Sequence, residues 1–481
     1  MATEIQAPRP EQFQRSLSLL DGTLLVIGSM IGSGIFITSA DMAAGLGSTG
    51  WLLTAWILSG VVTIIAAISY GELSGMFPKA GGQYVYLQEA FGNRIAFLYG
   101  WSFFAVIETG TIAAVAVAFA KYTGYIFPGV GEQNILLHIG ASFSVSAAQI
   151  LAIASILLLT LINSRGVKSG KWIQFIFTFI KIAALALLIL LGFWVSRHWD
   201  IFSQNMLHAW KAKAFTINQE AISSESLSTI GLIAAMGVAM VGALFSSDAW
   251  NGVTFIAGEI KNPKRNIGMS LFLGTLVVTI IYVSCNFMYV SVLPVSGVAA
   301  APDKRIAVAV AEQIIGLKGA MVIAAMIMVS TFGCNNGLIL AGARVYYQMA
   351  KDRLFFQPAG QLNRNGVPGK SLWLQAIWAS ALCLSGHYGD LLNFIIFTVL
   401  LFYILTIAGI FILRKKMPNA PRPYKAFGYP VLPAFYIIVA SAICIILLFE
   451  QTFYAGMGLV IVLIGLPIYE YFKRKHQPTN G

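Results

Sequence analysis

The chain contains little charge for its length. Asp, Glu, Lys and Arg make up 10% of its 481 residues, whereas 58% are hydrophobic. Ordinary soluble domains carry about 25% charged residues, so this composition excludes a soluble globular protein. The uncharged stretches are long enough to cross a membrane, for which a helix needs about 20 apolar residues.

Motifs of enzymes and metal sites are scarce as well. The five histidines form no H-E-x-x-H pattern, and the chain has no P-loop and no G-x-S-x-G. The four cysteines all fall within or near apolar stretches, and no loop between stretches carries a pair. We therefore expect no catalytic residue, no metal, no cofactor and no disulfide framework. A membrane-embedded enzyme is disfavoured on these grounds, and a membrane sensor is disfavoured because no long soluble output domain is present.

Twelve apolar stretches are candidates for membrane spans, although the fourth and the ninth are short, and none shows the alternation of a β-strand. The sequence therefore predicts an all-α integral membrane protein with twelve transmembrane helices. The expected helices lie at 17–43, 48–76, 93–120, 147–163, 169–195, 227–258, 266–293, 317–346, 371–386, 390–413, 431–449 and 452–472.

Basic residues are distributed unequally between the loops. The net charge is +12, and an even number of helices puts both termini on one side, where 23 of the 31 Lys and Arg residues fall. The positive-inside rule then predicts an inner or plasma membrane protein with both termini in the cytoplasm. The surplus charge reflects this topology and contact with anionic membrane lipid, so we expect no nucleic-acid partner.

Two of the apolar stretches are interrupted by small and polar residues. The first reads "GSMIGSGIF" over 28–36, and the second, five stretches later, reads "GALFSSDAWNG" over 242–252. An offset of 214 residues aligns Gly28 with Gly242. Interrupted helices at corresponding places in two halves of a chain are typical of transporters built from inverted repeats, and they mark the binding site.

A helix that unwinds inside a membrane exposes backbone groups that lipid cannot satisfy. The helix that starts after Gly34 would offer N–H donors and a positive dipole end to a carboxylate. Carbonyl groups near Ile31 and over 245–248 would suit an ammonium group. Together these two poles predict a site for an α-amino acid. One alternative stays open for the first stretch, because Gly28-x-x-x-Gly32 is also a helix-packing motif.

Several separated segments, in a fixed order, carry a resemblance to a known family. They are "IGSGIF" in the first stretch, "YGELSGMFPKAGGQYVYLQEAFG" (70–92), "INSRGVKSGKWIQFIFTFIKIAALALL" (162–188), "FSSDAWNGVTFIAGEIKNPKRN" (245–266), "STFGCNNG" (330–337) and "PRPYK" (421–425). Over about 15–425 the chain resembles the L-amino-acid transporter group of the amino acid–polyamine–organocation superfamily.

The resemblance implies a five-plus-five inverted repeat with discontinuous helices one and six, two additional helices, and alternating access. The expected parts are a cytoplasmic N-terminus (1–16), a first repeat (17–195), an extracytoplasmic loop (196–226), a second repeat (227–414), helices eleven and twelve (415–472) and a cytoplasmic tail (473–481).

The resemblance also implies roles for residues at the two interruptions. Backbone N–H groups of Ser33 and Gly34 would hold the substrate carboxylate. Carbonyls of Ile31 and Phe245 would take the ammonium, and the Phe245 ring would close the pocket as a lid.

Further pocket residues follow from the same resemblance. Asn251 would be a polar residue just past the second interruption, and Thr111 would line the pocket with a small hydroxyl. Val399 departs from the family pattern, because many animal members have a polar residue there. Loop 121–147 lacks the cysteine that joins animal members to a glycoprotein, so we expect no disulfide-linked heavy subunit.

Three ionisable residues lie deep within the predicted helices, where charge is costly and usually functional. The resemblance implies that Lys181 reaches the first interruption and replaces a bound cation, although its side chain could also extend to the cytoplasm. Asp248 could cap the second half-helix or act as a counter-charge for a cationic side chain. Glu108 could couple transport to protons or be a buried structural carboxyl.

These observations predict an amino acid transporter that works by sodium-independent exchange or facilitated transport. L-amino acids are the expected substrates, neutral ones most of all and cationic ones in addition. The competing hypothesis is a proton-coupled symporter of amino acids or polyamines that uses Glu108.

Overall fold

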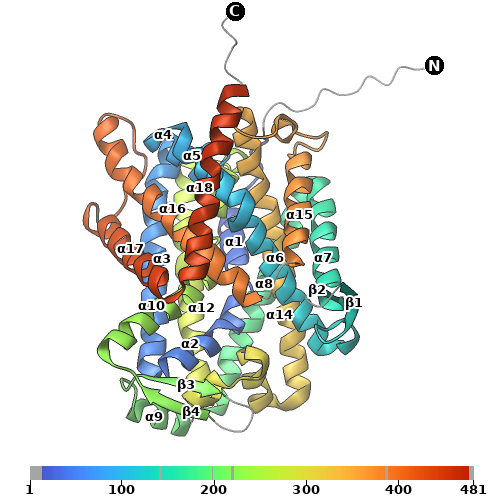
Figure 1. Cartoon of the computed structure of the whole chain (residues 1–481), viewed down its shortest axis with the longest axis vertical. Helices are drawn as coiled ribbons and strands as arrows, with labels where there is room; N and C mark the ends of the chain where they lie inside the picture. The colour runs from blue at the N-terminus through green and yellow to red at the C-terminus, as the bar shows by residue number, and fades with distance from the viewer. Residues whose placement is uncertain (1–12, 140–142, 198, 218–221, 385–387, 476–481) are drawn as a thin grey trace, which may run out of the picture.

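The computed structural model describes residues 13–139, 143–197, 199–217, 222–384 and 388–475. Most of the expected N-terminal segment, the last residues of the tail, short parts of loop 196–226 and the end of the ninth expected span lie outside these ranges. Almost all described elements are helices, arranged as an upright bundle (Figure 1). The all-helical class predicted from the sequence is therefore confirmed.

Eleven helical segments among the described residues are long and apolar enough to cross a membrane. They are α1 (Leu19–Met30) with the 3₁₀ turn η1 (Gly34–Phe36), α3 (Thr49–Met76), α5 (Asn93–Ser102) with α6 (Glu108–Ile126), α7 (Ala147–Ser164), α8 (Val167–Val195), α10 (Thr229–Ser246), α12 (Pro263–Val292), α14 (Ile306–Lys351), α16 (Tyr388–Lys416), α17 (Val431–Glu450) and α18 (Thr452–Lys475).

The expected ninth span is the one that falls short. Its helix, α15 (Gly369–Cys383), has 15 residues and follows Pro368. A helix of that length extends about 22 Å, less than the roughly 30 Å of hydrocarbon in a bilayer. The described chain therefore has eleven helices of spanning length in place of the twelve predicted, and the ninth stretch, already short in the sequence, forms one short helix.

Two helices stop and resume in the places that the sequence marks. After α1 ends at Met30, residues 31–33 are not α-helical, and η1 leads into α2 (Thr38–Leu46). After α10 ends at Ser246, residues 247–251 lead into the short helix α11 (Gly252–Phe255). We call residues 31–36, which include η1, the first break, and we call residues 246–251, from the last residue of α10 to the start of α11, the second break.

The beginning of α1 shows how local sequence sets a helix boundary. Ser18 accepts a hydrogen bond from the Asp21 N–H, and the Asp21 carboxylate accepts one from the Ser18 N–H at 2.8 Å. This capping box satisfies two of the backbone donors that every helix start leaves unpaired. From there α1 packs centrally against α8, α12 and α14, which buries most of its second half.

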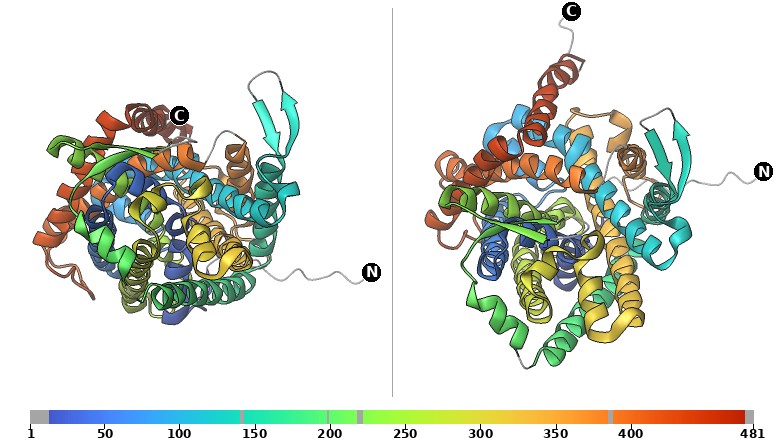
Figure 2. Two further views of the ribbon diagram at one scale, coloured as in Figure 1. Left: turned by 90° about the horizontal axis from the view of Figure 1, so that it is seen from below. Right: turned by 60° about the horizontal axis from the view of Figure 1, so that its bottom comes forward.

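Two β-hairpins were not expected from the sequence. Strands β1 (Ile135–Ile139) and β2 (Phe143–Ser146) form one, which projects sideways from the bundle (Figure 2). Strands β3 (Lys213–Ile217) and β4 (Ile222–Ser226) form the other, next to α9 (Asp200–Leu207) (Figure 1). The segments 121–147 and 196–226, expected as loops, therefore contain regular structure.

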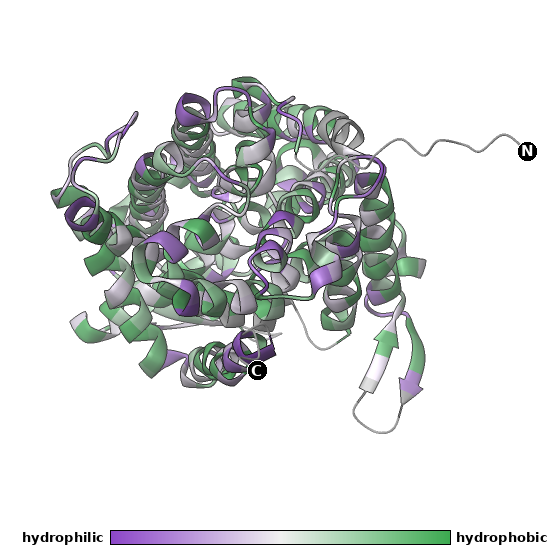
Figure 3. Ribbon diagram, turned by 90° about the horizontal axis from the view of Figure 1, so that it is seen from above, coloured by the Kyte–Doolittle hydropathy of each residue, from purple (hydrophilic) through white to green (hydrophobic). Residues whose placement is uncertain are grey.

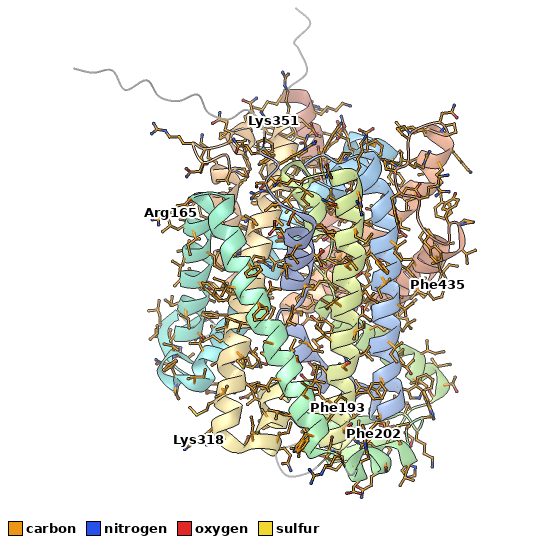
Figure 4. The ribbon with its side chains drawn as sticks, turned by 180° about the vertical axis from the view of Figure 1, so that it is seen from behind. Arg165, Phe193, Phe202, Lys318, Lys351 and Phe435 are labelled. Carbon is orange, nitrogen blue, oxygen red and sulfur yellow. The ribbon has the colours of Figure 1, made fainter. Side chains whose placement is uncertain are left out.

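The first helix begins and the last helix ends at the same end of the bundle, and the β3–β4 hairpin lies at the opposite end (Figure 1). Hydrophilic stretches connect the helices at the end shared by the termini (Figure 3). Arg165 and Lys351 lie at that end, whereas Lys318 lies at the other (Figure 4). This placement agrees with the sequence, in which the loops that contain Arg165 and Lys351 are counted on the same side as the termini and Lys318 is not.

Candidate substrate site

The two breaks lie directly against each other. A Cβ atom added at Gly34 would fall 2.7 Å from the Cα atom of Ser246, too close for any side chain to fit. The hydroxyl groups of Thr38 and Ser246 are 3.1 Å apart, which adds a hydrogen bond across the same contact. Gly34 is therefore required for the close approach of the two interrupted helices.

Gly28 and Gly32 serve helix packing, as the alternative interpretation of the first stretch expected. A Cβ atom at Gly28 would overlap the Gln174 side chain of α8, and one at Gly32 would lie 3.0 Å from Cys334 Sγ of α14. Small residues here let α1 approach both neighbours. The packing contacts involve Gly28 and Gly32, so they are compatible with the predicted binding role of Gly34.

The second break contains an unusual backbone conformation. Ala249 has φ of 63°, a left-handed value that is uncommon for a residue with a side chain. The Phe245 carbonyl accepts a hydrogen bond from the Asp248 N–H at 3.1 Å, which closes the turn after α10. Trp250 then packs against Tyr403 of α16, with ring centroids 5.2 Å apart. Strained backbone of this kind gathers at functional sites.

A narrow pocket with a free volume of about 20 Å³, room for about one water molecule, lies beside the second break. Three of the residues predicted for the substrate site line it, Thr111, Asp248 and Asn251, together with Glu108, the possible proton-coupling residue. Val399 of α16, where the chain departs from the family pattern, is also in the wall. The remaining lining residues are Gln83, Tyr99, Phe103, Ile107, Ala249, Leu338 and Tyr403.

Asp248 turns its carboxylate toward α16, where the Tyr403 hydroxyl donates a hydrogen bond to it at 2.5 Å. It does not cap the following helix. That helix, α11, starts at Gly252, and the residue in its N-cap position is Asn251, whose side chain makes no capping bond. The capping hypothesis for Asp248 is therefore wrong, because three residues lie between it and the first residue of α11.

Asn251 belongs to a chain of side-chain amides. Its Nδ2 donates to Gln83 Oε1 at 3.0 Å, and Gln83 Nε2 donates to Thr406 Oγ1 at 3.1 Å. Gln83 begins α4 (Gln83–Phe91), directly after two glycines with positive φ, and it was missed as a site residue. Its signal in the sequence is the "AGGQ" turn, but only the fold shows that this turn reaches the pocket.

Glu108 stands where the third span changes its helical pitch. Residues 103–107 form one turn of π-helix between α5 and α6, and π-turns of this kind are frequent at functional sites. The carboxyl is buried, and a Cβ atom at Gly342 of α14 would lie 2.7 Å from its Oε1 atom. Gly342 thus leaves the space that the carboxyl fills. In the described part of the chain, no cation lies within ion-pair distance of Glu108 or Asp248.

Lys181 reaches the first break from α8. Its ammonium donates to the carbonyls of Gly28 at 2.8 Å and Ile31 at 2.7 Å, and the residue is 1% exposed. The side chain therefore does not extend to the cytoplasmic surface, which was the alternative interpretation. The Ile31 carbonyl thus accepts a hydrogen bond from Lys181, and it accepts a second one from the Ser330 hydroxyl at 3.4 Å.

The predicted residues thus fall into two neighbouring groups. Those that line the pocket come from α6 and the second break. Ile31, Ser33, Gly34, Phe245 and Lys181 are not among the lining residues; they lie at the first break or at the end of α10. Among the described residues, no three metal-ligating side chains come together.

The profile of the amino acid permease family matches residues 17–466. The chain belongs to this family. It is therefore a multi-pass membrane transporter and not an enzyme, and the expected resemblance to the L-amino-acid transporter group is confirmed by the relatives below.

Three relatives of this amino acid permease cover almost all of its length. The large neutral amino acids transporter small subunit 2 of Mus musculus is 28% identical over 459 residues, which are 95% of this chain and 80% of the relative. The serine/threonine exchanger SteT of Bacillus subtilis is 28% identical over 466 residues, 96% and 98% of the two chains. The b(0,+)-type amino acid transporter 1 of Mus musculus is 26% identical over 462 residues, 95% and 88% of the two chains.

Proposed function

We propose that this permease moves L-amino acids across the membrane by sodium-independent exchange or facilitated transport, through alternating access. The observation that carries the proposal is the contact of the two breaks at Gly34 and Ser246, next to a pocket that contains Asp248 and Asn251. In this proposal α1–η1–α2 and α10–α11 are the discontinuous helices of an inverted repeat. The names of two relatives, a neutral amino acid transporter and a serine/threonine exchanger, support it.

The carboxylate of the substrate is assigned to the N–H groups of Ser33 and Gly34, at the start of η1. This assignment follows the general preference of helix N-termini for anions. The ammonium group is assigned to the second break, around the Phe245 carbonyl. The Ile31 carbonyl is a weaker candidate than the sequence implied, because the Lys181 ammonium already binds it at 2.7 Å.

The side chain of the substrate would then face α6 and α16. Ile107, Leu338 and Val399 make part of that wall apolar, which supports neutral substrates. The carboxyl groups of Glu108 and Asp248 lie in the same wall, which supports cationic substrates in addition. An apolar pocket with a few convergent polar groups is the usual form of a small-molecule site.

Lys181 is proposed to replace a bound cation. Its ammonium lies between two carbonyl oxygens of an interrupted helix, and oxygens in such places are ligands that sodium-coupled transporters offer to their ion. A fixed ammonium at this point would make external sodium unnecessary. Both termini are proposed to be cytoplasmic. No disulfide-linked subunit is proposed, because all four cysteines are free and buried.

A second candidate function is proton-coupled symport of amino acids or polyamines. The specific observation in its favour is the position of Glu108, a buried carboxyl in the pocket wall with no cation nearby in the described structure. A carboxyl of this kind can change its protonation as the pocket opens to water on either side.

Counterflow in proteoliposomes tests the first proposal and separates it from the second. Vesicles loaded with unlabelled serine or leucine should accumulate the labelled amino acid, with equal rates in sodium and choline buffers. Empty vesicles with an imposed pH gradient should show no concentrative uptake. Absence of counterflow for all tested amino acids would refute exchange, and pH-driven accumulation would favour the proton-coupled alternative.

A further inference from the structure

A basic pocket lies in the link between α16 and α17, away from the substrate site. It has a volume of about 360 Å³ and is lined by Arg414, Pro418, Ala420, Arg422 and Lys425, so every charged side chain in its wall is a cation. The link contains the segment "PRPYK", which the proposed transport mechanism does not use. Its chemistry therefore calls for a separate explanation.

The pocket is held in shape by bonds to its neighbours. Glu72, near the end of α3, accepts hydrogen bonds from Arg414 at 3.0 and 2.7 Å and lies 3.2 Å from Arg422. The Arg422 guanidinium also donates to four carbonyls around the end of α16: Leu413, Met417, Pro418 and Ala420. Arg414 lies over the Tyr429 ring, 3.6 Å from its centroid. The link is thus a fixed structure and not a loose run of basic residues.

The positive charge of the pocket exceeds what its partners neutralise. Three cations line it, and Glu72 is the only carboxylate that contacts them in the described structure. Glu72 is itself 1% exposed, so its charge is turned away from the opening. Lys425 is exposed and has no acidic partner among the described residues. The surplus charge favours an anion in this pocket.

The surface next to the pocket is apolar. Phe427 in the link is 73% exposed, and Val431 and Ile438 on α17 are 70% and 67% exposed. Val431, Phe435 and Ile438 follow the spacing of one helix face, and Phe435 lies on the outer edge of the bundle (Figure 4). A free inorganic anion would make no favourable contact with this apolar surface, but a molecule with a charged head and apolar chains would.

We propose that the link and the adjoining face of α17 form a binding site for an anionic phospholipid of the membrane. The phosphate group lies against Lys425 and the outer side of Arg414, and the acyl chains pack on Phe427, Val431 and Ile438. The site is at the end of the molecule that carries the termini. Gly50, at the start of α3, is hydrogen-bonded to Ala209 beside the hairpin β3–β4, and Glu72 lies near the other end of α3. Basic pockets between helices on the cytoplasmic side are known to hold anionic headgroups.

Native mass spectrometry of the full-length protein tests the site with phosphatidylglycerol and phosphatidylcholine as probes. The wild type should retain phosphatidylglycerol in preference to phosphatidylcholine. Lys425→Ala should weaken phosphatidylglycerol binding about fivefold, the effect of removing one basic residue near a headgroup. Lys261→Ala, an exposed lysine in another loop of the same end, is the matched control and should leave binding unchanged.

Two further arms distinguish the possible ligands. Phe427→Ser should reduce the retention of phosphatidylglycerol, and soluble glycerol phosphate at millimolar concentration should not displace the lipid. The proposal would be overturned if the wild type retained the two lipids equally, or if Lys425→Ala retained phosphatidylglycerol as well as the wild type does. Full displacement by glycerol phosphate would also overturn it, in favour of a soluble anion. Because lipid retention is measured without transport, its failure would leave the transport proposal untouched.

Discussion

Asp248 has one strong side-chain partner in the pocket, the Tyr403 hydroxyl at 2.5 Å. Since the residue does not cap α11, its charge remains available for a ligand. Asp248→Asn would keep a hydrogen-bond acceptor for Tyr403 and remove only the charge. If Asp248 is the counter-charge for a cationic side chain, this change should weaken competition by Arg and Lys tenfold or more, a loss of about 1.4 kcal/mol.

The control for Asp248 is Tyr403→Phe, which removes the hydrogen bond and keeps the charge. We expect it to preserve competition by Arg, and we expect Ala to compete equally in all three proteins. Inhibition of labelled uptake by Arg and by Ala gives the comparison. If Asp248→Asn and the wild type show the same profile, the carboxylate has no part in recognising a cation.

Lys181 contributes to both stability and transport in our proposal. Two hydrogen bonds from a charged group contribute about 1.5–3 kcal/mol each, so Lys181→Ala should lower the free energy of unfolding by roughly 3 kcal/mol or more. Transport per folded molecule should fall further than the amount of protein does. Lys121→Ala, a partly buried lysine near the outer end of α6, is the control and should transport normally.

Sodium dependence separates the structural role of Lys181 from its proposed ionic role. Wild-type uptake should be the same when choline replaces sodium. Uptake that stops in choline would show that a sodium ion is still needed, and Lys181 would then be a purely structural contact of the first break.

The two interrupted helices approach each other closely where Gly34 meets Ser246. Gly34→Ala would place a Cβ atom 2.7 Å from the Cα atom of Ser246, so the breaks must separate. We expect this variant to lose most transport and to melt at a lower temperature. Gly45→Ala, on α2 of the same span, meets nothing within 4 Å and should be harmless. A Gly34→Ala protein with normal transport would show that the contact is not needed.

The sequence predicted these helices well where a long apolar run decided the outcome. It also located both breaks, because glycine and serine in the middle of a span are a strong local signal. It also indicated that the ninth stretch, now α15, is short. It missed the two hairpins and the π-turn before Glu108, since neither produces a change in hydropathy. Gln83 was missed for a different reason: it meets Asn251 across 168 residues of chain, and only packing brings them together.

The bundle as a whole has one basic end and one end covered by α9 and the β3–β4 hairpin. The covering is tied to the spans, because the Gly50 N–H of α3 donates to the Ala209 carbonyl at 2.8 Å and Trp51 packs on Trp210. At the other end, the first described residues join the loop after α11, where Leu17 and Ile260 form a parallel bridge. Both ends of the bundle therefore connect segments that are far apart in the chain.

We propose an orientation of this bundle in the membrane from its charges. Basic residues predominate at the end that carries the termini, and the positive-inside rule predicts that this end faces the cytoplasm. Arg165 and Lys318 lie at opposite ends of the molecule and are both exposed (Figure 4). All four native cysteines are buried, so they should give little background with a thiol reagent. In intact cells, a membrane-impermeant maleimide should label Lys318→Cys at once and Arg165→Cys only after the membrane is permeabilised. The reverse pattern would place the basic end outside, and the assignment of the lipid site to the cytoplasmic leaflet would fall with it.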